Sequence, residues 1–282
     1  MKQPLLDRDF PDPHVLATPS GLYLYGTETA GLWNVQVAVT RDGVHAEHLG
    51  DALPTLPTWA RRGKTWAPRV IAHDGLYLMY FTAWHEGTLD QAIGVAWSDR
   101  PEGPFIPYDL PLLVGFIDAD VFRDDDGSLY LFYAGCGETT GGIWGQRLTP
   151  DGLSLWGLSH LKQSAWRLDE EGVVEAPCVF KHDGRYIMLY SVAPFDTPHY
   201  AVHYAEASAP LGSYRKPDDN TVLAGPSGPG HCDVTCLNPD ESLTIVYHAW
   251  RGPIGYGAGG YRAAYSAPLT WRDGRPVVEH GA

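Results

Sequence analysis

The stretch IDADVFRDDDGSLYLFYAG (117–135) contains two apolar segments separated by an acidic turn that ends at Gly127. The segments read as buried strands, and a glycine at the turn supplies the positive φ that a tight hairpin needs. The three aspartates of the turn, residues 124–126, are followed at once by Gly127 without further ligand positions, so we interpret them as a solvated turn rather than a calcium loop. The stretch therefore predicts a β-hairpin.

The second half of this hairpin recurs five times along the chain. The copies are GLYLYG (21–26), GLYLMYFTA (75–83), GSLYLFYAG (127–135), GRYIMLYSV (184–192) and SLTIVYHAW (242–250). Aligned on the last tyrosine of each, they are separated by 55, 53, 57 and 57 residues. A repeat of about 55 residues is long enough for a four-stranded antiparallel blade, and five blades closed in a ring leave few exposed edges. The sequence predicts an all-β, five-bladed β-propeller formed by residues 1–282 as a single domain.

The composition agrees with many short strands in one domain. Among 282 residues there are 32 Gly and 23 Pro, and 44% of the chain is hydrophobic, which favours tight turns around one large core over long helices. The net charge of −14 argues against binding to nucleic acid or to an anionic membrane surface, because phosphates are bound by Lys and Arg. A neutral partner fits better.

The segment MKQPLLDRDFPDP (1–13) carries acidic residues and three prolines instead of an apolar run of secretory length. No later stretch approaches 18 consecutive apolar residues. We therefore expect a cytoplasmic protein with no membrane segment. The four cysteines lack the spacing of a zinc site and are expected to be buried thiols; they are Cys136, Cys178, Cys232 and Cys236.

Each repeat opens with a short segment that carries a polar residue in four of the five copies. The openings are PDPHVL (11–16), WAPRVI (66–71), IDADVF (117–122), VEAPCVF (174–180) and GHCDVT (230–235). Asp12, Asp118, Glu175 and His231 lie 13, 15, 15 and 16 residues before the aligned tyrosine, so we expect them to occupy one repeated structural position. The innermost strands of a propeller line its central channel, so these side chains should converge there. Three converging carboxylates raise each other's pKa and indicate a functional site.

Each of these residues also has an ordinary structural interpretation. An Asp before or near a turn, such as Asp12 or Asp118, commonly serves the turn itself. Glu175 has apolar neighbours, so its carboxyl group is either paired or protonated. His231 is either a structural histidine or a contact to substrate, to an ordered water or to a cation.

Several of these segments resemble glycoside hydrolase family 43, whose members are five-bladed propellers and include β-xylosidases, α-L-arabinofuranosidases and arabinanases. The three segments that resemble the family's catalytic motifs are FPDPHVL (10–16), GFIDADVFRDDDGSLYLFYAG (115–135) and VVEAPCVFKHDGRYIMLYS (173–191). The resemblance implies that Asp12 is the general base, Asp118 the auxiliary aspartate and Glu175 the general acid. Ala176 departs from the family pattern, which usually has Gly after the acid.

Three further segments also look like family segments, and the likeness runs from about residue 9 to residue 278. They are TWAPRV (65–70), GPGHCD (228–233) and GYRAAYSAPLTWRDGRPV (260–277). The last implies that Arg262 contacts the sugar in the terminal subsite. Trp66 and Phe116 lie beside repeat openings, where their rings could stack on a sugar.

The resemblance implies an inverting glycoside hydrolase that releases α-L-arabinofuranosyl or β-D-xylosyl units from short oligosaccharides. An inverting enzyme needs roughly 6.5–9.5 Å between its two carboxyl groups to admit water. No cofactor is expected to be required, and a Ca²⁺ near His231 on the channel axis is a further expectation. Two alternatives stay open: a retaining propeller glycosidase with Asp12 as nucleophile, and a carbohydrate-binding propeller without activity.

Overall fold

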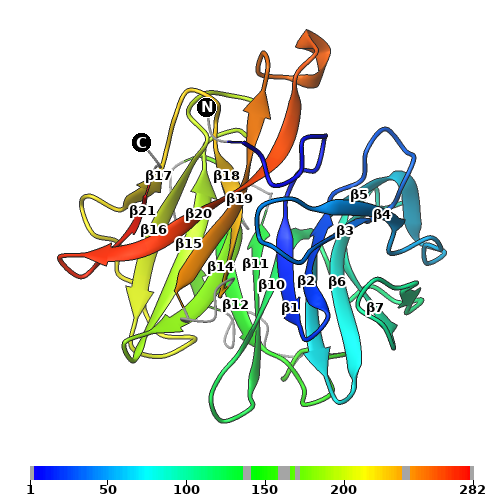
Figure 1. The fold of residues 1–282 in the computed structure, drawn as a ribbon. Coiled ribbons are helices and arrows are strands. Elements are labelled where there is room, and N and C mark those ends of the chain that lie inside the picture. The colour runs from blue at the N-terminus through cyan, green and yellow to red at the C-terminus, as the bar shows by residue number, and fades with distance from the viewer. Residues whose placement is uncertain (1–2, 136–140, 158–165, 169–171, 237–241, 280–282) are drawn as a thin grey trace.

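The chain folds into five antiparallel sheets set around one axis (Figure 1), so the predicted five-bladed β-propeller is confirmed. The computed structural model describes residues 3–135, 141–157, 166–168, 172–236 and 242–279. Within these residues the helical structure is a single 3₁₀ turn, η2 (Tyr256–Ala258), and none of it is long and apolar enough to cross a lipid bilayer.

The five sheets, called blades 1 to 5 here, follow the chain in order. Blade 1 contains β1 (His14–Thr18), β2 (Gly21–Gly26), β3 (Gln36–Thr40) and β4 (Glu47–Asp51). Blade 2 contains β5 (Ala60–His73), β6 (Leu76–His85), β7 (Asp90–Ser98), β8 (Ile106–Pro107) and β9 (Leu113–Val114). Blade 3 contains β10 (Phe116–Arg123), β11 (Leu129–Gly135), β12 (Gly142–Arg147) and β13 (Trp166–Leu168). Blade 4 contains β14 (Val174–His182), β15 (Arg185–Val192), β16 (Ala201–Ala207) and β17 (Thr221–Leu223). Blade 5 contains β18 (Gly230–Cys236), β19 (Leu243–Arg251), β20 (Tyr261–Arg272) and β21 (Arg275–Val278).

The predicted hairpins join the first two strands of the blades. In blade 2 the turn residues Asp74 and Gly75 have φ of 48° and 80°, and in blade 4 Asp183 and Gly184 have φ of 48° and 71°. Two consecutive residues with positive φ are what a type I′ turn requires, and this turn matches the twist of the strands it joins. The aligned tyrosines lie on the second strands or beside them and are buried, which confirms that they pack the cores; they are Tyr25, Tyr80, Tyr133, Tyr190 and Tyr247.

The innermost strands of blades 2 to 5 each contain a bulge. The register of pairing shifts after Trp66, Ile117, Glu175 and Gly230. The residue that follows each of these has positive φ, and Asp12 has the same conformation just before β1; the five residues are Asp12 (55°), Ala67 (46°), Asp118 (56°), Ala176 (54°) and His231 (44°). A bulge re-aims the side chains at its start, so two consecutive residues of one strand can reach the channel.

This geometry corrects one expectation from the sequence. Asp12, Asp118 and His231 do share one position, but Glu175 lies one residue earlier, in the position that Trp66 and Ile117 occupy in their blades. The offset is hidden because the hairpin turn of blade 3 (124–128) is longer than that of blade 4 (183–184), so Asp118 and Glu175 both lie 15 residues before their tyrosines.

The ring is closed between blades 5 and 1 by a segment that precedes β1. The backbone N–H of Leu5 donates to the carbonyl of Ala264 at 2.8 Å, and that of Phe10 donates to the carbonyl of Arg262 at 2.8 Å. Both acceptors lie on β20. This pairing brings Asp12 and Arg262 together although they are 250 residues apart.

The cysteine prediction is confirmed in part. Cys178 and Cys232 are buried and form no disulfide bond, whereas Cys236 is exposed at the end of β18, so the expectation of burial is wrong there. Cys136 lies outside the described residues.

Candidate active site

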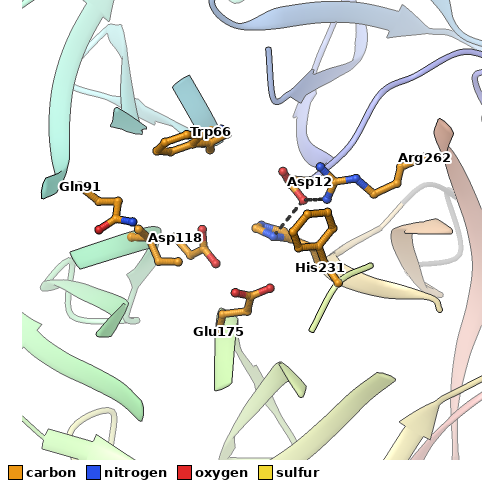
Figure 2. Close-up of a pocket in the computed structure, with 9 residues that line it drawn as sticks. Asp12, Trp66, Gln91, Asp118, Glu175, His231 and Arg262 are labelled. Carbon is orange, nitrogen blue, oxygen red and sulfur yellow. Dashed lines mark hydrogen bonds and ion pairs between the residues drawn. The ribbon is translucent and has the colours of Figure 1, made fainter. Parts of the chain in front are cut away.

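A cavity of about 270 Å³ lies where the five blades meet (Figure 2). Its lining includes residues from every blade: Asp12, Trp66, Gln91, Ile117, Asp118, Glu175, Phe195, His231 and Arg262. Six of the seven predicted site residues are therefore brought together, and the exception is Phe116.

Phe116 was expected to face a sugar but packs into the core. Its ring meets Tyr133 edge-on at 4.9 Å between centroids and Trp144 at 6.2 Å. Successive side chains of a strand point to opposite sides, so Ile117 lines the pocket instead. The prediction for Phe116 is wrong by one residue.

Asp12 is held as a carboxylate by the groups that face it. The guanidinium of Arg262 donates from Nη1 to Oδ1 at 3.0 Å, and the hydroxyl of Thr27 donates to Oδ2 at 2.5 Å. Burial alone would raise the pKa of Asp12, but the charge of Arg262, followed by the ring of His231, holds it well below its ordinary value. Asp12 is therefore ionised and able to accept a proton.

Glu175 reaches the same pocket from β14 and is kept in the opposite state. Its pKa is raised to about 7. Burial is the largest cause and the negative charge of Asp12 acts in the same direction, whereas a hydrogen bond from Tyr200 and the charge of Arg262 oppose the rise. The Tyr200 hydroxyl donates to Oε1 at 2.8 Å. A carboxyl group with this pKa carries a proton over much of the neutral range and can donate it.

Asp118 connects to the segment that carries Glu175. Its Oδ2 accepts the backbone N–H of Ala176 at 3.0 Å, and its own N–H donates to the hydroxyl of Thr82 at 3.0 Å. Burial, followed by the charges of Glu175 and Asp12, raises the pKa of Asp118 well above its ordinary value. Asp118 and Glu175 thus form a pair of buried acids that disfavour ionisation of one another.

Four of the five positive-φ residues at the inner strands donate their backbone N–H to a side chain of the preceding blade, in its second strand or just beyond it. Ala67 donates to Thr27 at 2.9 Å, Asp118 to Thr82 at 3.0 Å, His231 to Ser191 at 2.8 Å and Asp12 to Nδ1 of His248 at 3.0 Å. In blade 3 the residues after Tyr133 are Ala134 and Gly135, which have no hydroxyl, and Asp118 itself accepts the bond from Ala176. These contacts position the bulges, because buried N–H groups need acceptors.

The side chains that accept these N–H groups were not predicted from the sequence, although their positions after the aligned tyrosines follow a pattern. Thr27, Thr82, Ser191 and His248 each lie one or two residues after an aligned tyrosine. Burial lowers the pKa of His248 to about 4, so its ring is neutral and Nδ1 is free to accept the N–H of Asp12.

Two further residues of the lining come from outside the inner strands. Gln91 lies on β7, and Phe195 lies in the segment between β15 and β16. The guanidinium of Arg262 lies over the Phe195 ring at 4.7 Å and over the Tyr256 ring at 5.7 Å. Neither Gln91 nor Phe195 has a counterpart in the repeat, so the period of the sequence carries no signal for them.

His231 lies beside Asp12, with 3.4 Å between Nδ1 and Oδ1 (Figure 2). Burial lowers the pKa of His231, which keeps its ring neutral and able to contact a polar substrate group. The described residues contain no group of three or more His, Cys, Asp or Glu side chains placed to hold a metal ion. Ca²⁺ takes six to eight oxygen ligands, and Arg262 already neutralises Asp12, so this donor set does not fit the ion and no step below uses a metal.

The inner strands also carry a buried ion network. Each of its members lies two residues after one of the positive-φ residues. Nη1 of Arg69 lies 2.5 Å from Oδ1 of Asp233, and Nε of Arg69 lies 3.0 Å from Oδ1 of Asp120. Nδ1 of His14 lies 2.7 Å from Oδ2 of Asp233. The network ties together the inner strands of blades 1, 2, 3 and 5 next to the pocket.

The chain matches the family model described as Glycosyl hydrolases family 43 over residues 1–276. It is 29% identical to an extracellular endo-α-(1→5)-L-arabinanase of Thermotoga petrophila, over 92% of this chain and 62% of the arabinanase. It is 44% identical over 84 residues to xylosidase/arabinosidase 43A of Humicola insolens, which covers 29% of this chain and 23% of that protein. The chain thus spans less than two thirds of the length of either relative. A crystal structure of a thermostable family-43 glycoside hydrolase superposes with a TM-score of 0.86 at 28% identity, over 99% of this chain and 96% of that one. With a propeller fold, a pocket lined by three carboxyl groups and a match along almost its whole length, the chain belongs to glycosyl hydrolase family 43.

Proposed function

We propose that the chain is an inverting glycoside hydrolase in which Glu175 is the general acid, Asp12 the general base and Asp118 the residue that tunes and positions the acid. The observation that carries this proposal is that two carboxyl groups of one pocket have pKa values pushed apart. Asp12 is held ionised by Arg262, whereas Glu175 has a pKa of about 7. Glycoside hydrolysis requires this pairing of a protonated and an ionised carboxyl group.

In the proposed reaction Glu175 protonates the glycosidic oxygen as the bond to the anomeric carbon breaks. Asp12 takes a proton from a water molecule whose oxygen bonds the anomeric carbon from the opposite face. Both oxygens of Asp12 already accept hydrogen bonds, from Arg262 and Thr27, which stabilises its charge and keeps it ionised to receive this proton. Trp66, His231 and Arg262 are proposed to contact the sugar.

We propose a terminal α-L-arabinofuranosyl or β-D-xylosyl unit of a short oligosaccharide as the substrate. The cavity of about 270 Å³ is slightly below the roughly 300–1,000 Å³ of pockets that hold drug-sized ligands, which suits one or two sugar rings. Internal cleavage of arabinan is the second candidate, because the Thermotoga petrophila relative is named an endo-arabinanase. Nitrophenyl α-L-arabinofuranoside and β-D-xyloside, compared with linear arabinan, separate the two: release of monosaccharide alone supports terminal action, and a rapid fall in polymer length supports internal action.

The assignment of acid and base is tested by varying the leaving group. Glu175→Ala should lose orders of magnitude in kcat on an oligosaccharide but far less on a dinitrophenyl glycoside, because that phenolate leaves without protonation. Asp12→Ala should be impaired on both substrates, since water needs activation in each case. The reverse pattern would exchange the two roles, and full activity of both variants would refute the proposed site.

Inversion is tested by NMR of the first-formed anomer of the product. A product of retained configuration would instead support Asp12 as a nucleophile. A complete lack of turnover on all these substrates, with sugar binding intact, would support a binding propeller.

A further inference from the structure

Tyr200, which the sequence did not single out, is held rigidly beside Glu175. Its side chain is fully buried at the start of blade 4's third strand, and its ring stacks on His248 with 5.7 Å between centroids and 8° between planes. On another side the ring meets the backbone of Gly230, where an added Cβ would lie 2.0 Å from ring carbon Cε1. Gly230 thus makes the space that the ring fills, and the hydroxyl donates to Oε1 of Glu175 at 2.8 Å.

The hydrogen bonds behind Tyr200 have a defined direction. The backbone N–H of His231 can only donate, and it donates to the hydroxyl oxygen of Ser191 at 2.8 Å. This contact occupies a lone pair of Ser191 and leaves its hydrogen to face the hydroxyl of Tyr200, whose pKa Ser191 acts to lower. The hydrogen of Tyr200 is then directed to Oε1 of Glu175. Burial, followed by the charge of Glu175, raises the pKa of Tyr200 well above its ordinary value, so the phenol keeps this hydrogen.

We infer that Tyr200 is the positioning residue of the general acid: the chain from His231 through Ser191 and Tyr200 keeps Oε1 of Glu175 as an acceptor and leaves Oε2 as the oxygen that carries and delivers the proton. The inference rests on the proposed function, in which Glu175 is the acid. Oε2 is the oxygen available to a glycosidic oxygen in the pocket, because Oε1 is turned toward Tyr200.

Titratable and charged groups from five other inner elements surround Glu175. They are Asp12 before β1, Asp118 on β10, His231 on β18, His248 on β19 and Arg262 on β20. These groups act on Glu175 through their charge or their contacts to one another, whereas the Tyr200 hydroxyl donates directly to Oε1 at 2.8 Å. Removing the Tyr200 hydroxyl should therefore change the pKa and the orientation of the Glu175 carboxyl group, while the rest of the pocket stays in place.

The test uses Tyr200→Phe, which removes the hydroxyl and keeps the ring. Loss of a donor to the carboxylate should raise the pKa of Glu175, so the alkaline limb of kcat/KM should move up by about one pH unit. Since the acid is then held less well, kcat on an unactivated oligosaccharide should fall about 10–100-fold, the range expected when general acid help is impaired. The rate on a dinitrophenyl glycoside should change only a few-fold. Ser191→Ala should give the same pattern more weakly.

A matched control is Tyr80→Phe. Tyr80 is also fully buried and its hydroxyl also donates at 2.8 Å, but to the carbonyl of Gly152 in the core between blades 2 and 3. This variant should leave the pH profile and the dependence on the leaving group unchanged. If Tyr200→Phe behaves like Tyr80→Phe, or loses activity equally on both substrates with an unchanged profile, the positioning role is overturned.

A titration by ¹³C NMR of labelled glutamate, with the Glu175 signal assigned by Glu175→Gln, measures the same pKa without turnover. A higher pKa in Tyr200→Phe supports the inference, and an unchanged pKa overturns it. Failure of the proposed function looks different: Glu175→Gln would then remain active on the oligosaccharide, although the NMR titration would still report the bond between Tyr200 and Glu175.

Discussion

Arg262 was expected to contact the sugar, but in the structure it contacts Asp12, the proposed base, directly. Its guanidinium is buried between Phe195 and Tyr256 and pairs with Asp12. The charge and the rigid fork of Arg262 thus keep Asp12, the proposed base, ionised before any substrate arrives. A role toward the sugar remains part of the proposed function and uses the same side chain.

Arg262→Met should raise the pKa of Asp12, because it removes the positive charge and keeps much of the volume. An Asp beside an Arg typically has its pKa lowered by about 1–3 units, so the acid limb of kcat/KM should move to higher pH by a shift of this order. In the proposed mechanism activity requires ionised Asp12 and is lost as the pH falls through its pKa, so the variant should lose activity at a higher pH than the parent. Arg275→Met, which breaks an exposed pair with Asp219, is the control and should have no such effect. An unmoved acid limb would show that Arg262 does not govern the base.

Asp118 can be tested for two separable effects on the proposed acid, as the second ionisable group of the pair and through its hydrogen bond. Asp118→Asn removes the charge and keeps an oxygen that can accept the N–H of Ala176, whereas Asp118→Ala removes both. Without a second acid in the pair, the pKa of Glu175 should fall, so the alkaline limb of the pH profile should move down in both variants. Asp118→Ala should in addition lose at least about tenfold more kcat, because the segment carrying Glu175 loses its anchor. Identical kinetics for the two variants would mean that the hydrogen bond has no role.

At the scale of elements, the bulges of the inner strands decide which side chains enter the pocket. Ala176 has φ of 54°, a conformation that costs a residue with a Cβ roughly 1–2 kcal/mol. Ala176→Gly should therefore change the free energy of unfolding little, since relief of this strain offsets the loss of a buried methyl group. Ala119→Gly, a buried alanine of β10 outside the positive-φ set, should destabilise by about 1–2 kcal/mol. Denaturant unfolding of the two variants checks the difference, and equal losses would remove the bulge conformation as the cause.

The same bulges explain how much of the site could be predicted. The repeat and the hairpin glycines are local patterns, so the fold and the convergence of Asp12, Asp118 and Glu175 followed from the sequence. Phe116 was expected to face the pocket because it lies beside a repeat opening, but side chains alternate along the strand and the sequence does not show that Ile117 is the one that faces inward. Gln91 and Phe195 line the pocket, and Tyr200 contacts Glu175 behind it, from strands or connections without a repeated pattern. Their placement depends on long-range packing, which the repeat of the sequence does not reveal.

At the scale of the whole molecule, the ion network around Arg69 links four blades next to the pocket. Arg69→Met would remove the cation that faces the buried carboxylates of Asp120 and Asp233, leaving Asp233 with His14 alone in the network. Breaking a buried pair in this way typically costs about 3–5 kcal/mol, so a fall of this order in the free energy of unfolding is expected. Arg185→Met, in a partly exposed pair with Glu206, should cost far less. Similar losses in the two variants would contradict a special role for the network.

The pairing of residues 5–10 with β20 also has a consequence for synthesis on the ribosome. Asp12 emerges early, but Arg262, His231 and His248, which surround it, all belong to blade 5. A nascent chain with four completed blades therefore holds the proposed acid and its partner Asp118 without the environment that ionises the base. Catalytic competence should appear abruptly, after the β20 segment has left the exit tunnel, and a copy cut short within blade 5 should be hydrolytically silent.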